Sequence, residues 1–303
     1  MLSSAHSANY IRGISWFILS LVISVINDAF AKYLGEDLHS IQITFLRFLF
    51  ATISLVPFMI YCGKKSFYTS RIGLHFIRGM LLFAAIALWC VGLTQAPIVV
   101  ATTLTFIIPM FVLILARFFL KEKVGYARWI VTIIGFFGAT LILEPTNVNF
   151  SPLILLLVLA TLMFATLDVI NKKFVVKESM LAMLFYTALI TMALGIIPTL
   201  FIWKTPSMSQ LFFLFLIGCG GNLLLFCLLK AFAAMEASAL APFRYVELIL
   251  SAGLGIVVFN EIPTLALCLG TLIIVPCTLF LIYAETKTKP IDATNSKVIP
   301  QEN

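Results

Sequence analysis

The stretch that decides the fold class is GMLLFAAIALWCVGLTQAPIVVATTLTFIIPMFVLILA, residues 79–116, where 38 consecutive positions lack Asp, Glu, Lys, Arg and His. As a single helix rising about 1.5 Å per residue, it would be about 57 Å long. The hydrocarbon core of a bilayer is only about 30 Å thick. The stretch therefore predicts two membrane-spanning helices, and the sequence TQAP at 94–97 predicts the turn between them.

The composition of the whole chain agrees with a lipid environment. Of its 303 residues, 62% are hydrophobic and 11% are charged, and the mean hydropathy is +1.11. A water-soluble domain usually contains about 25% charged residues. The pattern predicts an all-α integral membrane protein in a lipid bilayer, with ten transmembrane helices at 11–31, 41–61, 75–93, 98–117, 126–143, 152–171, 180–203, 211–230, 238–259 and 264–283. The remaining residues, 284–303, form a polar tail predicted to be disordered.

The net charge of +7 is distributed as an orientation signal. If the N-terminus is cytoplasmic, only Lys32 and Lys204 of the span-flanking basic residues fall outside. The cytoplasmic links then carry Lys64, Lys65, Arg71, Lys121, Lys123, Arg128, Lys172, Lys173, Lys177 and Lys230. We therefore predict that both termini and the polar tail are cytoplasmic, and we predict no nucleic-acid partner. The first apolar stretch is interpreted as a span rather than a cleaved signal.

The cysteines and histidines predict no metal site. The six cysteines lie within or at the ends of the predicted spans without CxxC spacing, and the three histidines are isolated. Motifs of enzyme chemistry, GxSxG, HExxH, GxxxxGK[ST] and GxGxxG, do not occur in the sequence. The sequence therefore predicts neither an enzyme nor a bound cofactor.

Two pairs of similar motifs indicate an internal repeat. DAFAK at 28–32 ends the first predicted span, and DVINK at 168–172 ends the sixth, 140 residues later. Glu122 and Glu261 close the fourth and ninth spans, 139 residues apart. Because five spans are an odd number, a second copy enters the membrane from the opposite side. We predict two inverted five-helix repeats, residues 11–143 and 152–283, which is a plan typical of secondary transporters.

These features together resemble the EamA-type drug/metabolite transporters. The resemblance rests on the duplicated ten-span plan, Arg47 early in the second span, Pro109 within the fourth, and Glu122 and Glu261 closing spans four and nine. The stretch APFRYVELILSAGLGIVVFNEIP at 241–263 is similar to a signature of one branch of the family. The similarity covers about residues 12–283. One departure is Thr187, which stands at the repeat position of Arg47 and argues against a symmetric role for that arginine.

Within this family the sequence resembles the branch that takes up S-adenosylmethionine in intracellular bacteria. The resemblance implies a small-molecule substrate, S-adenosylmethionine, imported across the bacterial inner membrane by alternating access, with exchange for S-adenosylhomocysteine as one coupling scheme. Two alternatives stay open at this point. One is an exporter of amino acids or other organic cations, and the other is a membrane-embedded enzyme or a non-transporting assembly subunit. The sequence predicts no particular oligomeric state.

Asp28 and Arg47 are the first candidates for a substrate path. Asp28 is either an anionic contact for a cationic ligand or a helix-end charge paired with Lys32. For Asp168, which stands in the same relation to Lys172, the interfacial interpretation is favoured. Arg47 stands in the apolar sequence TFLRFLF, where an unpaired guanidinium costs at least about 2.5 to 3.5 kcal/mol. We therefore favour a cavity-lining Arg47, paired with a carboxylate or with the ligand, over an Arg47 that snorkels to the membrane interface.

The ninth predicted span contributes the other candidates. Arg244 and Glu247 are three positions apart, so a local ion pair is one interpretation, with Tyr245 between them. The alternative is that Glu247 lines the path and contacts positive charge, with Arg244 orienting it. Trp16, Trp89 and Tyr186 are candidates for stacking on an adenine ring, although packing is the favoured interpretation of each. Glu122 and Glu261 are expected to cap or pair with a neighbouring helix.

Overall fold

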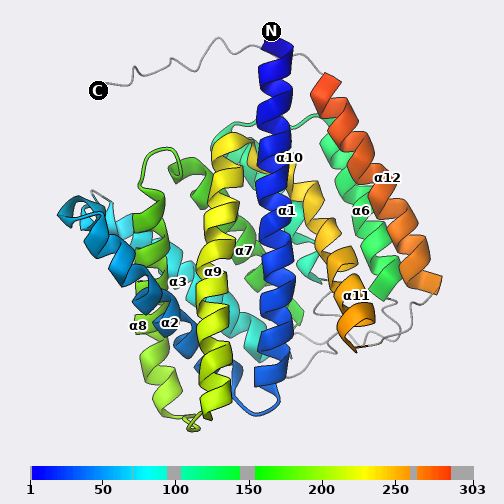
Figure 1. Cartoon of the computed structure of the whole chain (residues 1–303). Coiled ribbons are helices and arrows are strands. Elements are labelled where there is room, and N and C mark those ends of the chain that lie inside the picture. Colours follow the sequence, from blue (N-terminus) through cyan, green and yellow to red (C-terminus); the bar gives the residue numbers. More distant parts are fainter. Residues whose placement is uncertain (1, 70, 94–103, 144–153, 260–264, 288–303) are drawn as a thin grey trace.

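The chain folds as a bundle of helices, and a computed structural model describes residues 2–69, 71–93, 104–143, 154–259 and 265–287. The longer helices are α1 (Leu2–Gly35), α2 (Ser40–Tyr61), α3 (Ile72–Leu93), α6 (Tyr126–Leu143), α7 (Ile154–Phe174), α8 (Met180–Leu200), α9 (Met208–Ala234), α11 (Val246–Phe259) and α12 (Leu265–Lys287). The shorter elements are η1 (Lys64–Phe67), α5 (Ile108–Leu115), η2 (Ala116–Leu120), α10 (Ala237–Leu240) and η3 (Ala241–Tyr245). Helix α1 begins and α12 ends at the same end of the bundle (Figure 1).

The helices agree with the predicted all-α class. Each of the ten predicted segments overlaps a described helix, although the turn predicted at 94–97 and the start of the fourth segment lie outside the described residues. Among the described residues, seven helices are long and apolar enough to cross a membrane: α1, α2, α3, α7, α8, α9 and α12. The apolar helices of the fourth and fifth segments, 108–120 and 126–141, are shorter.

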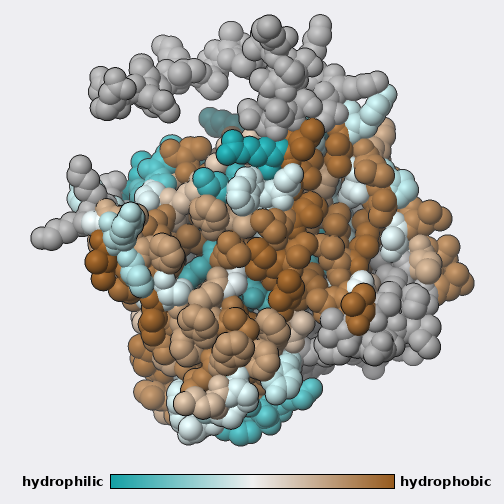
Figure 2. Space-filling model, viewed as in Figure 1, coloured by the Kyte–Doolittle hydropathy of each residue, from teal (hydrophilic) through white to brown (hydrophobic). Residues whose placement is uncertain are grey.

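The outer surface is apolar in a way that suits contact with lipid. Large hydrophobic side chains are strongly exposed on several helices, including Phe58 of α2, Phe137 of α6 and Leu272 of α12. Figure 2 shows apolar residues over most of the middle of one face, with hydrophilic residues gathered towards its two ends. A soluble monomer rarely exposes apolar patches of such extent. The protein is therefore a multi-pass membrane protein.

The helices of the two halves pack on each other across the middle of the bundle. Helix α1 packs along α9, and α3 packs along α7. In the same way α5 contacts α7 while α11 contacts α1, and α2 packs on α8 while α6 packs on α12. When the first five predicted segments are exchanged with the second five, the α1–α9 contact becomes the α7–α3 contact and the α5–α7 contact becomes the α11–α1 contact. The α2–α8 and α6–α12 contacts are left unchanged by the exchange. Most of the bundle is therefore held together by packing between the halves.

Two glycines lie at tight helix crossings of this arrangement. A Cβ on Gly79 of α3 would lie 2.5 Å from Cγ2 of Ile190 on α8. A Cβ on Gly218 of α9 would lie 2.7 Å from the backbone oxygen of Arg47 and 2.9 Å from Cβ of Phe50 on α2. The two glycines are 139 positions apart, and Phe50 and Ile190 are 140 apart. Small residues let the helix backbones approach closely at both crossings.

The fourth and ninth predicted spans are both interrupted. The helix at 104–105 is separated from α5 by a turn at Phe106 and Ile107. Pro109 stands at the start of α5, where its missing N–H does not break a ladder of hydrogen bonds. In the ninth span the 3-10 segment η3 separates α10 from α11. Phe106 and Tyr245 are 139 positions apart and their rings stack at 5.8 Å, so the two interruptions meet.

Candidate functional site

A cavity of about 580 Å³ lies inside the bundle. Its walls come from both halves of the chain, with lining residues on α1, α2, α3, α5, α7, α8, α9 and α11. The volume falls in the range of about 300 to 1,000 Å³ that is usual for small-molecule sites. Three carboxylates and three guanidinium groups line it: Asp28, Asp168, Glu247, Arg47, Arg78 and Arg244. Such a concentration of charge inside a membrane bundle marks a candidate substrate site.

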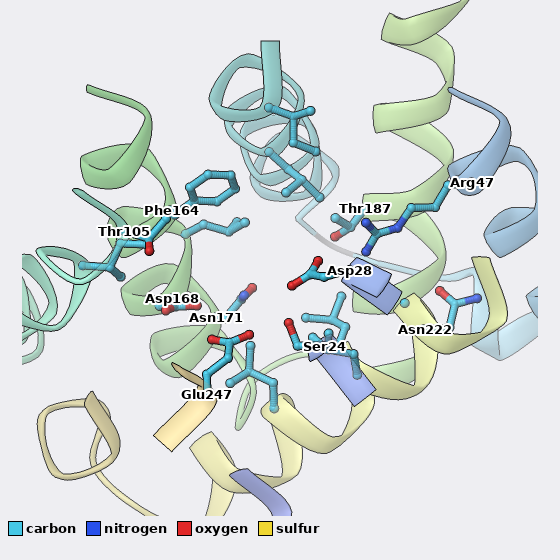
Figure 3. A pocket seen from close by; sticks show the side chains of 18 of the residues that line it. Ser24, Asp28, Arg47, Thr105, Phe164, Asp168, Asn171, Thr187, Asn222 and Glu247 are labelled. Atoms are coloured by element: carbon cyan, nitrogen blue, oxygen red, sulfur yellow. The ribbon is translucent and has the colours of Figure 1, made fainter. Parts of the chain in front are cut away.

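Asp28 and Arg47 face each other in this cavity. The carboxylate of Asp28, on α1, and the guanidinium of Arg47, which extends from α2, both reach into this space and lie near each other (Figure 3). Among the described residues neither side chain forms an ion pair, and Nε of Arg47 is buried without a hydrogen-bond partner. The ring of Phe48 lies 5.5 Å from the Arg47 guanidinium carbon. Lys32, the alternative partner of Asp28, has a side chain outside the described set.

Asp168 has a partner that the sequence analysis did not predict. This carboxylate of α7 is buried and accepts a hydrogen bond from Nη2 of Arg244, so the two form an ion pair. Lys172, the expected partner at i+4, instead donates from Nζ to the backbone oxygens of Phe232 and Met235, each at 2.6 Å. The interfacial interpretation of Asp168 is therefore wrong. Arg244 also does not pair with Glu247, because its guanidinium is directed to α7.

Glu247 stands on the cavity wall at the start of α11. Its polar neighbour is the hydroxyl of Ser24 on α1, and among the described residues it forms no ion pair. Figure 3 shows the Glu247 carboxylate and Ser24 pointing into the same space as Asp28. The ninth span thus reaches two helices at once, α7 through Arg244 and α1 through Glu247. Unlike Asp168, both Asp28 and Glu247 keep a carboxylate free for a cationic group.

The predicted aromatic residues separate into two groups. Trp89 lines the cavity beside apolar residues that include Ile86, Phe106 and Phe164. Trp16 is not among the lining residues and packs edge-on against Phe226, with ring centroids 6.1 Å apart. Of the three stacking candidates, only Trp89 is therefore placed on the cavity; Tyr186 is described below.

Tyr245 is buried beside the cavity and is not among its lining residues. Its hydroxyl donates to the backbone oxygens of Phe106 at 3.2 Å and Thr132 at 2.9 Å. A Cβ on Gly135 of α6 would lie 2.5 Å from the tyrosine ring, so the ring occupies the space which that glycine leaves free. The structure thus gives Tyr245 a packing position, while its neighbours Arg244 and Glu247 face the cavity.

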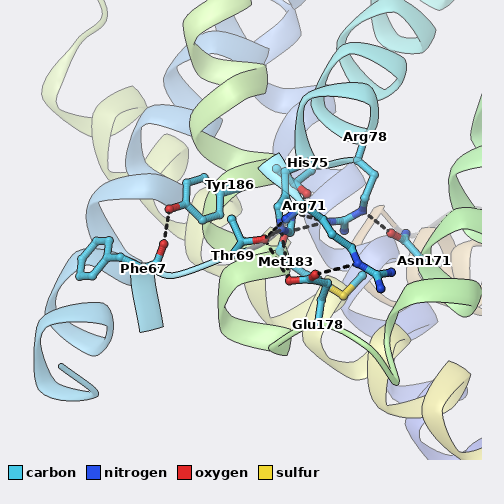
Figure 4. A network of polar contacts seen from close by, with 10 residues as sticks. Phe67, Thr69, Arg71, His75, Arg78, Asn171, Glu178, Met183 and Tyr186 are labelled. Carbon is cyan, nitrogen blue, oxygen red and sulfur yellow. Dashed lines mark hydrogen bonds and ion pairs between the residues drawn. The ribbon is translucent and has the colours of Figure 1, made fainter. Parts of the chain in front are cut away.

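A second polar cluster adjoins the cavity, and Tyr186 is its only member that the sequence analysis proposed as a site residue. Arg78 of α3 is fully buried and donates from Nε to Oδ1 of Asn171 at 2.8 Å and from Nη1 to the backbone oxygen of Met183 at 3.1 Å. Nη1 also lies 3.4 Å from Nδ1 of His75. Beyond it Glu178 contacts Thr69, Arg71 and His75 (Figure 4). The sequence signal that could have selected Arg78 is its position directly before the long uncharged run that starts at Gly79.

Tyr186 belongs to this second cluster. Its ring lies on that of His75 with centroids 5.1 Å apart, and its hydroxyl donates to the backbone oxygen of Phe67 at 2.6 Å (Figure 4). It is not one of the residues that line the cavity. The cluster joins η1, α3, α7 and α8, so it ties the elements beside one end of the cavity to one another.

Glu122 caps a helix of the other half, as expected for a residue at the end of a span. Lys121 adopts a left-handed conformation with φ of 57° and ends the π-helical turn η2. The next residue, Glu122, then accepts hydrogen bonds from the backbone nitrogens of Ala237 and Ser238, both at 3.0 Å. A carboxylate at a helix N-terminus is favourable because the N–H groups there lack partners. Glu261 lies outside the described residues.

Comparisons with known proteins identify the family. The sequence profile of the EamA-like transporter family matches residues 11–144 and again residues 151–283. The chain belongs to the EamA-like transporter family. The resemblance noted from the sequence motifs is thereby confirmed.

Its relatives within the family are named as transporters. An S-adenosylmethionine uptake transporter of Rickettsia prowazekii (strain Madrid E) is 50% identical, with 92% of this chain and 95% of the relative covered. A riboflavin transporter of Vibrio cholerae is 31% identical, with 91% and 95% covered. A solved crystal structure, 15% identical, covers 94% of this chain and 99% of its own, with a TM-score of 0.77, and shows the same fold. These relatives confirm the expectation of a transporter rather than an enzyme.

Proposed function

We propose that this protein imports S-adenosylmethionine across the bacterial inner membrane. Four Rickettsia relatives, 49 to 50% identical over nearly the whole chain, are named as uptake transporters of this metabolite. The observation in the chain itself that carries the proposal is that two carboxylates on one cavity, Asp28 and Glu247, form no ion pair with any residue that the structure describes. S-adenosylmethionine has two positively charged groups, a sulfonium and an ammonium. Riboflavin has no fixed positive charge, so the two free carboxylates favour the former substrate.

The proposed mechanism is alternating access between two inverted repeats, residues 11–143 and 152–283, which together supply ten spans. The exchangeable helix contacts, the paired glycines Gly79 and Gly218, and the stacking of Phe106 on Tyr245 support this plan. The two matches of the family profile support it as well. Inverted-repeat transporters bind substrate at the interface of their halves, often beside interrupted helices. The cavity, with walls from both halves, lies at such an interface.

The proposed orientation has both termini, and the polar tail 284–303, in the cytoplasm. It rests on the basic residues of the links on the side where α1 begins and α12 ends. Charge distribution fixes the orientation of the chain and leaves the direction of net flux to the gradients of the solutes. We propose import because the Rickettsia relatives are named as uptake transporters. Exchange for S-adenosylhomocysteine is the coupling we propose, because both molecules carry the same adenosine and amino-acid groups.

Uptake into proteoliposomes tests the proposal. We expect saturable uptake of labelled S-adenosylmethionine by the purified protein, stimulated by S-adenosylhomocysteine inside the vesicles. No saturable uptake by a folded preparation would refute the substrate assignment, and uptake without stimulation from inside would refute exchange.

A single variant tests the role of the carboxylates in this assay. Glu247→Gln removes one unpaired charge, and we expect its uptake to fall by at least about tenfold, as for a lost charge-assisted contact. Glu36→Gln is the matched control, because Glu36 is exposed at the end of α1, away from the cavity. Uptake at the parental rate by a folded Glu247→Gln protein would contradict the contact role.

A further inference from the structure

The cavity separates its free charges by sign. Of the six charged residues on its wall, Asp168 and Arg244 neutralise each other. Arg78 keeps its charge, but its Nε and Nη1 donate to the amide of Asn171 and to the backbone oxygen of Met183. The other charged groups of the wall that form no ion pair among the described residues are the carboxylates of Glu247 and Asp28 and the guanidinium of Arg47. Figure 3 shows Glu247 on one side of the space, Arg47 on the opposite side and Asp28 between them.

Arg47 is held in place without having its charge neutralised. Gly218 lies against the backbone of Arg47, and a Cβ on Gly221 would lie 3.2 Å from Nη2 of the guanidinium. The missing side chain at 221 thus gives the guanidinium its place beside α9, while the Phe48 ring lies near its carbon atom. Among the described residues no acceptor satisfies its buried Nε. An arginine in such a position is costly in a membrane unless an anion binds to it.

We propose that the gap between Asp28 and Arg47 binds the zwitterionic head of an α-amino acid, with its carboxylate on Arg47 and its ammonium on Asp28. The two charges of an amino-acid head are attached to one carbon atom. Their complement is therefore a carboxylate and a guanidinium that face each other without touching, which is how Asp28 and Arg47 are arranged. The planar fork of a guanidinium also matches the geometry of a carboxylate.

This inference rests on the proposed function and narrows its substrate class. In S-adenosylmethionine the sulfonium is separated from the amino-acid head by two methylene groups. With the head between Asp28 and Arg47, the sulfonium is directed towards Glu247 and Ser24, and the adenine towards the apolar wall that contains Trp89 and Phe164. The transporter then requires the whole amino acid, so nucleosides and thioethers that lack it are poor substrates. S-adenosylhomocysteine keeps the head and loses only the contact of the sulfonium.

The test pairs a change in the ligand with a change in the protein. Competition against labelled S-adenosylmethionine is measured on purified protein with S-adenosylmethionine and with its decarboxylated analogue, for the parent, Arg47→Gln and Arg47→Lys. In the parent we expect the decarboxylated compound to bind at least about tenfold more weakly, as for a lost charge-assisted bond. In Arg47→Gln we expect the affinity for S-adenosylmethionine to fall by a similar factor, while the affinity for the decarboxylated analogue changes by less than about twofold. Arg47→Lys should restore part of the preference for S-adenosylmethionine over its decarboxylated analogue.

The controls separate this subsite from a merely structural arginine. Arg117→Gln removes an exposed arginine of η2 and should leave both affinities unchanged. Equal weakening of both ligands by Arg47→Gln, or by Arg47→Lys if the glutamine variant does not fold, would overturn the carboxylate assignment. A parent protein that binds S-adenosylmethionine but prefers its decarboxylated analogue would overturn it too. A parent protein that binds neither compound would instead refute the proposed function, and the subsite with it.

Discussion

Asp28 and Asp168 occupy the same position in the two halves of the chain and have different surroundings. They are 140 residues apart, on α1 and α7, and both line the central cavity. Asp168 is buried and paired with Arg244, whereas Asp28 is exposed to the cavity and forms no ion pair among the described residues. The position that corresponds to Arg244 at the offset of 139 is Thr105, which explains why only one half has this pair. A duplicated scaffold has thus acquired one structural and one available carboxylate.

The largest expected effect is on the stability of the paired side. Asp168→Asn leaves the guanidinium of Arg244 without its anion in a buried site, which typically costs about 3 to 5 kcal/mol. We expect a much lower unfolding temperature in detergent for this variant than for Asp28→Asn. The double variant Asp168→Asn with Arg244→Gln should recover part of the loss. If Asp168→Asn were as stable as the parent, the assignment of a structural pair would be wrong.

We expect Asp28→Asn to change the stability of the protein little and its uptake of substrate strongly. Because Asp28 forms no ion pair among the described residues, the variant breaks no direct salt bridge and only removes the negative charge near Arg47, so the free energy of unfolding should change by less than it does in Asp168→Asn. Uptake of S-adenosylmethionine should fall by about tenfold to a hundredfold, the size of a charge-assisted contact. Parallel measurements of uptake in proteoliposomes and of thermal unfolding provide the check. A loss of stability equal to that of Asp168→Asn would remove the distinction between the two aspartates.

Gly79 and Gly218, the glycines at the two helix crossings, allow a second comparison of the two halves, with a smaller expected effect on stability. In Gly218→Ala the new Cβ meets backbone atoms of Arg47 and Ala51, at 2.7 and 3.0 Å, which cannot move without shifting α2. In Gly79→Ala it meets Cγ2 and Cβ of Ile190, at 2.5 and 2.6 Å, and the Cβ atom moves only with the backbone of α8. We expect each variant to lose about 1 to 3 kcal/mol of stability. Thermal unfolding of the two variants side by side measures these losses, and parental stability in either variant would contradict a tight helix crossing at that glycine.

The smallest effect is expected at Tyr245. Removal of its hydroxyl in Tyr245→Phe leaves the backbone oxygens of Phe106 and Thr132 without this donor, at a cost of about 1 kcal/mol. Because the residue lies outside the cavity wall, the affinity for S-adenosylmethionine should stay at the parental value. Competition binding measures that affinity directly. A selective loss of affinity without loss of stability would instead place Tyr245 in the binding site.

The sequence predicts the helices well because lipid imposes a simple rule on them. Uncharged runs and short charged links locate the ten long segments, and the repeats of Asp28 with Asp168 and of Glu122 with Glu261 indicate the duplication. The prediction of a disordered tail from residue 284 is wrong for its first turn, because α12 continues to Lys287. Partners are harder to predict, because they depend on how helices distant in the chain are rotated against each other. Arg244 and Glu247 are close in sequence, yet one is directed to α7 and the other to α1.

The same limitation explains the cluster around Arg78 and Glu178. Its members come from four separate elements, and each one taken alone looks like an ordinary charge at the end of a span. The aromatic candidates were uncertain for a related reason, since 28 phenylalanines make most rings packing residues. Only the position of Trp89 on the inner face of α3 distinguishes it from Trp16 and Tyr186. That position depends on tertiary packing rather than on local sequence.

The packing of α1 along α9 and of α3 along α7 also has a consequence for biosynthesis. Synthesis proceeds from the N-terminus, so the helices from α1 to α6 emerge while their partners in the second half do not yet exist. During that interval Asp28, Arg47 and Arg78 lack the helices that later enclose them, and Glu122 has no helix to cap. The first half is therefore a biosynthetic intermediate in which these polar groups do not yet have their contacts with the second half. Its lifetime in the membrane is set by how soon translation delivers α7 and α9.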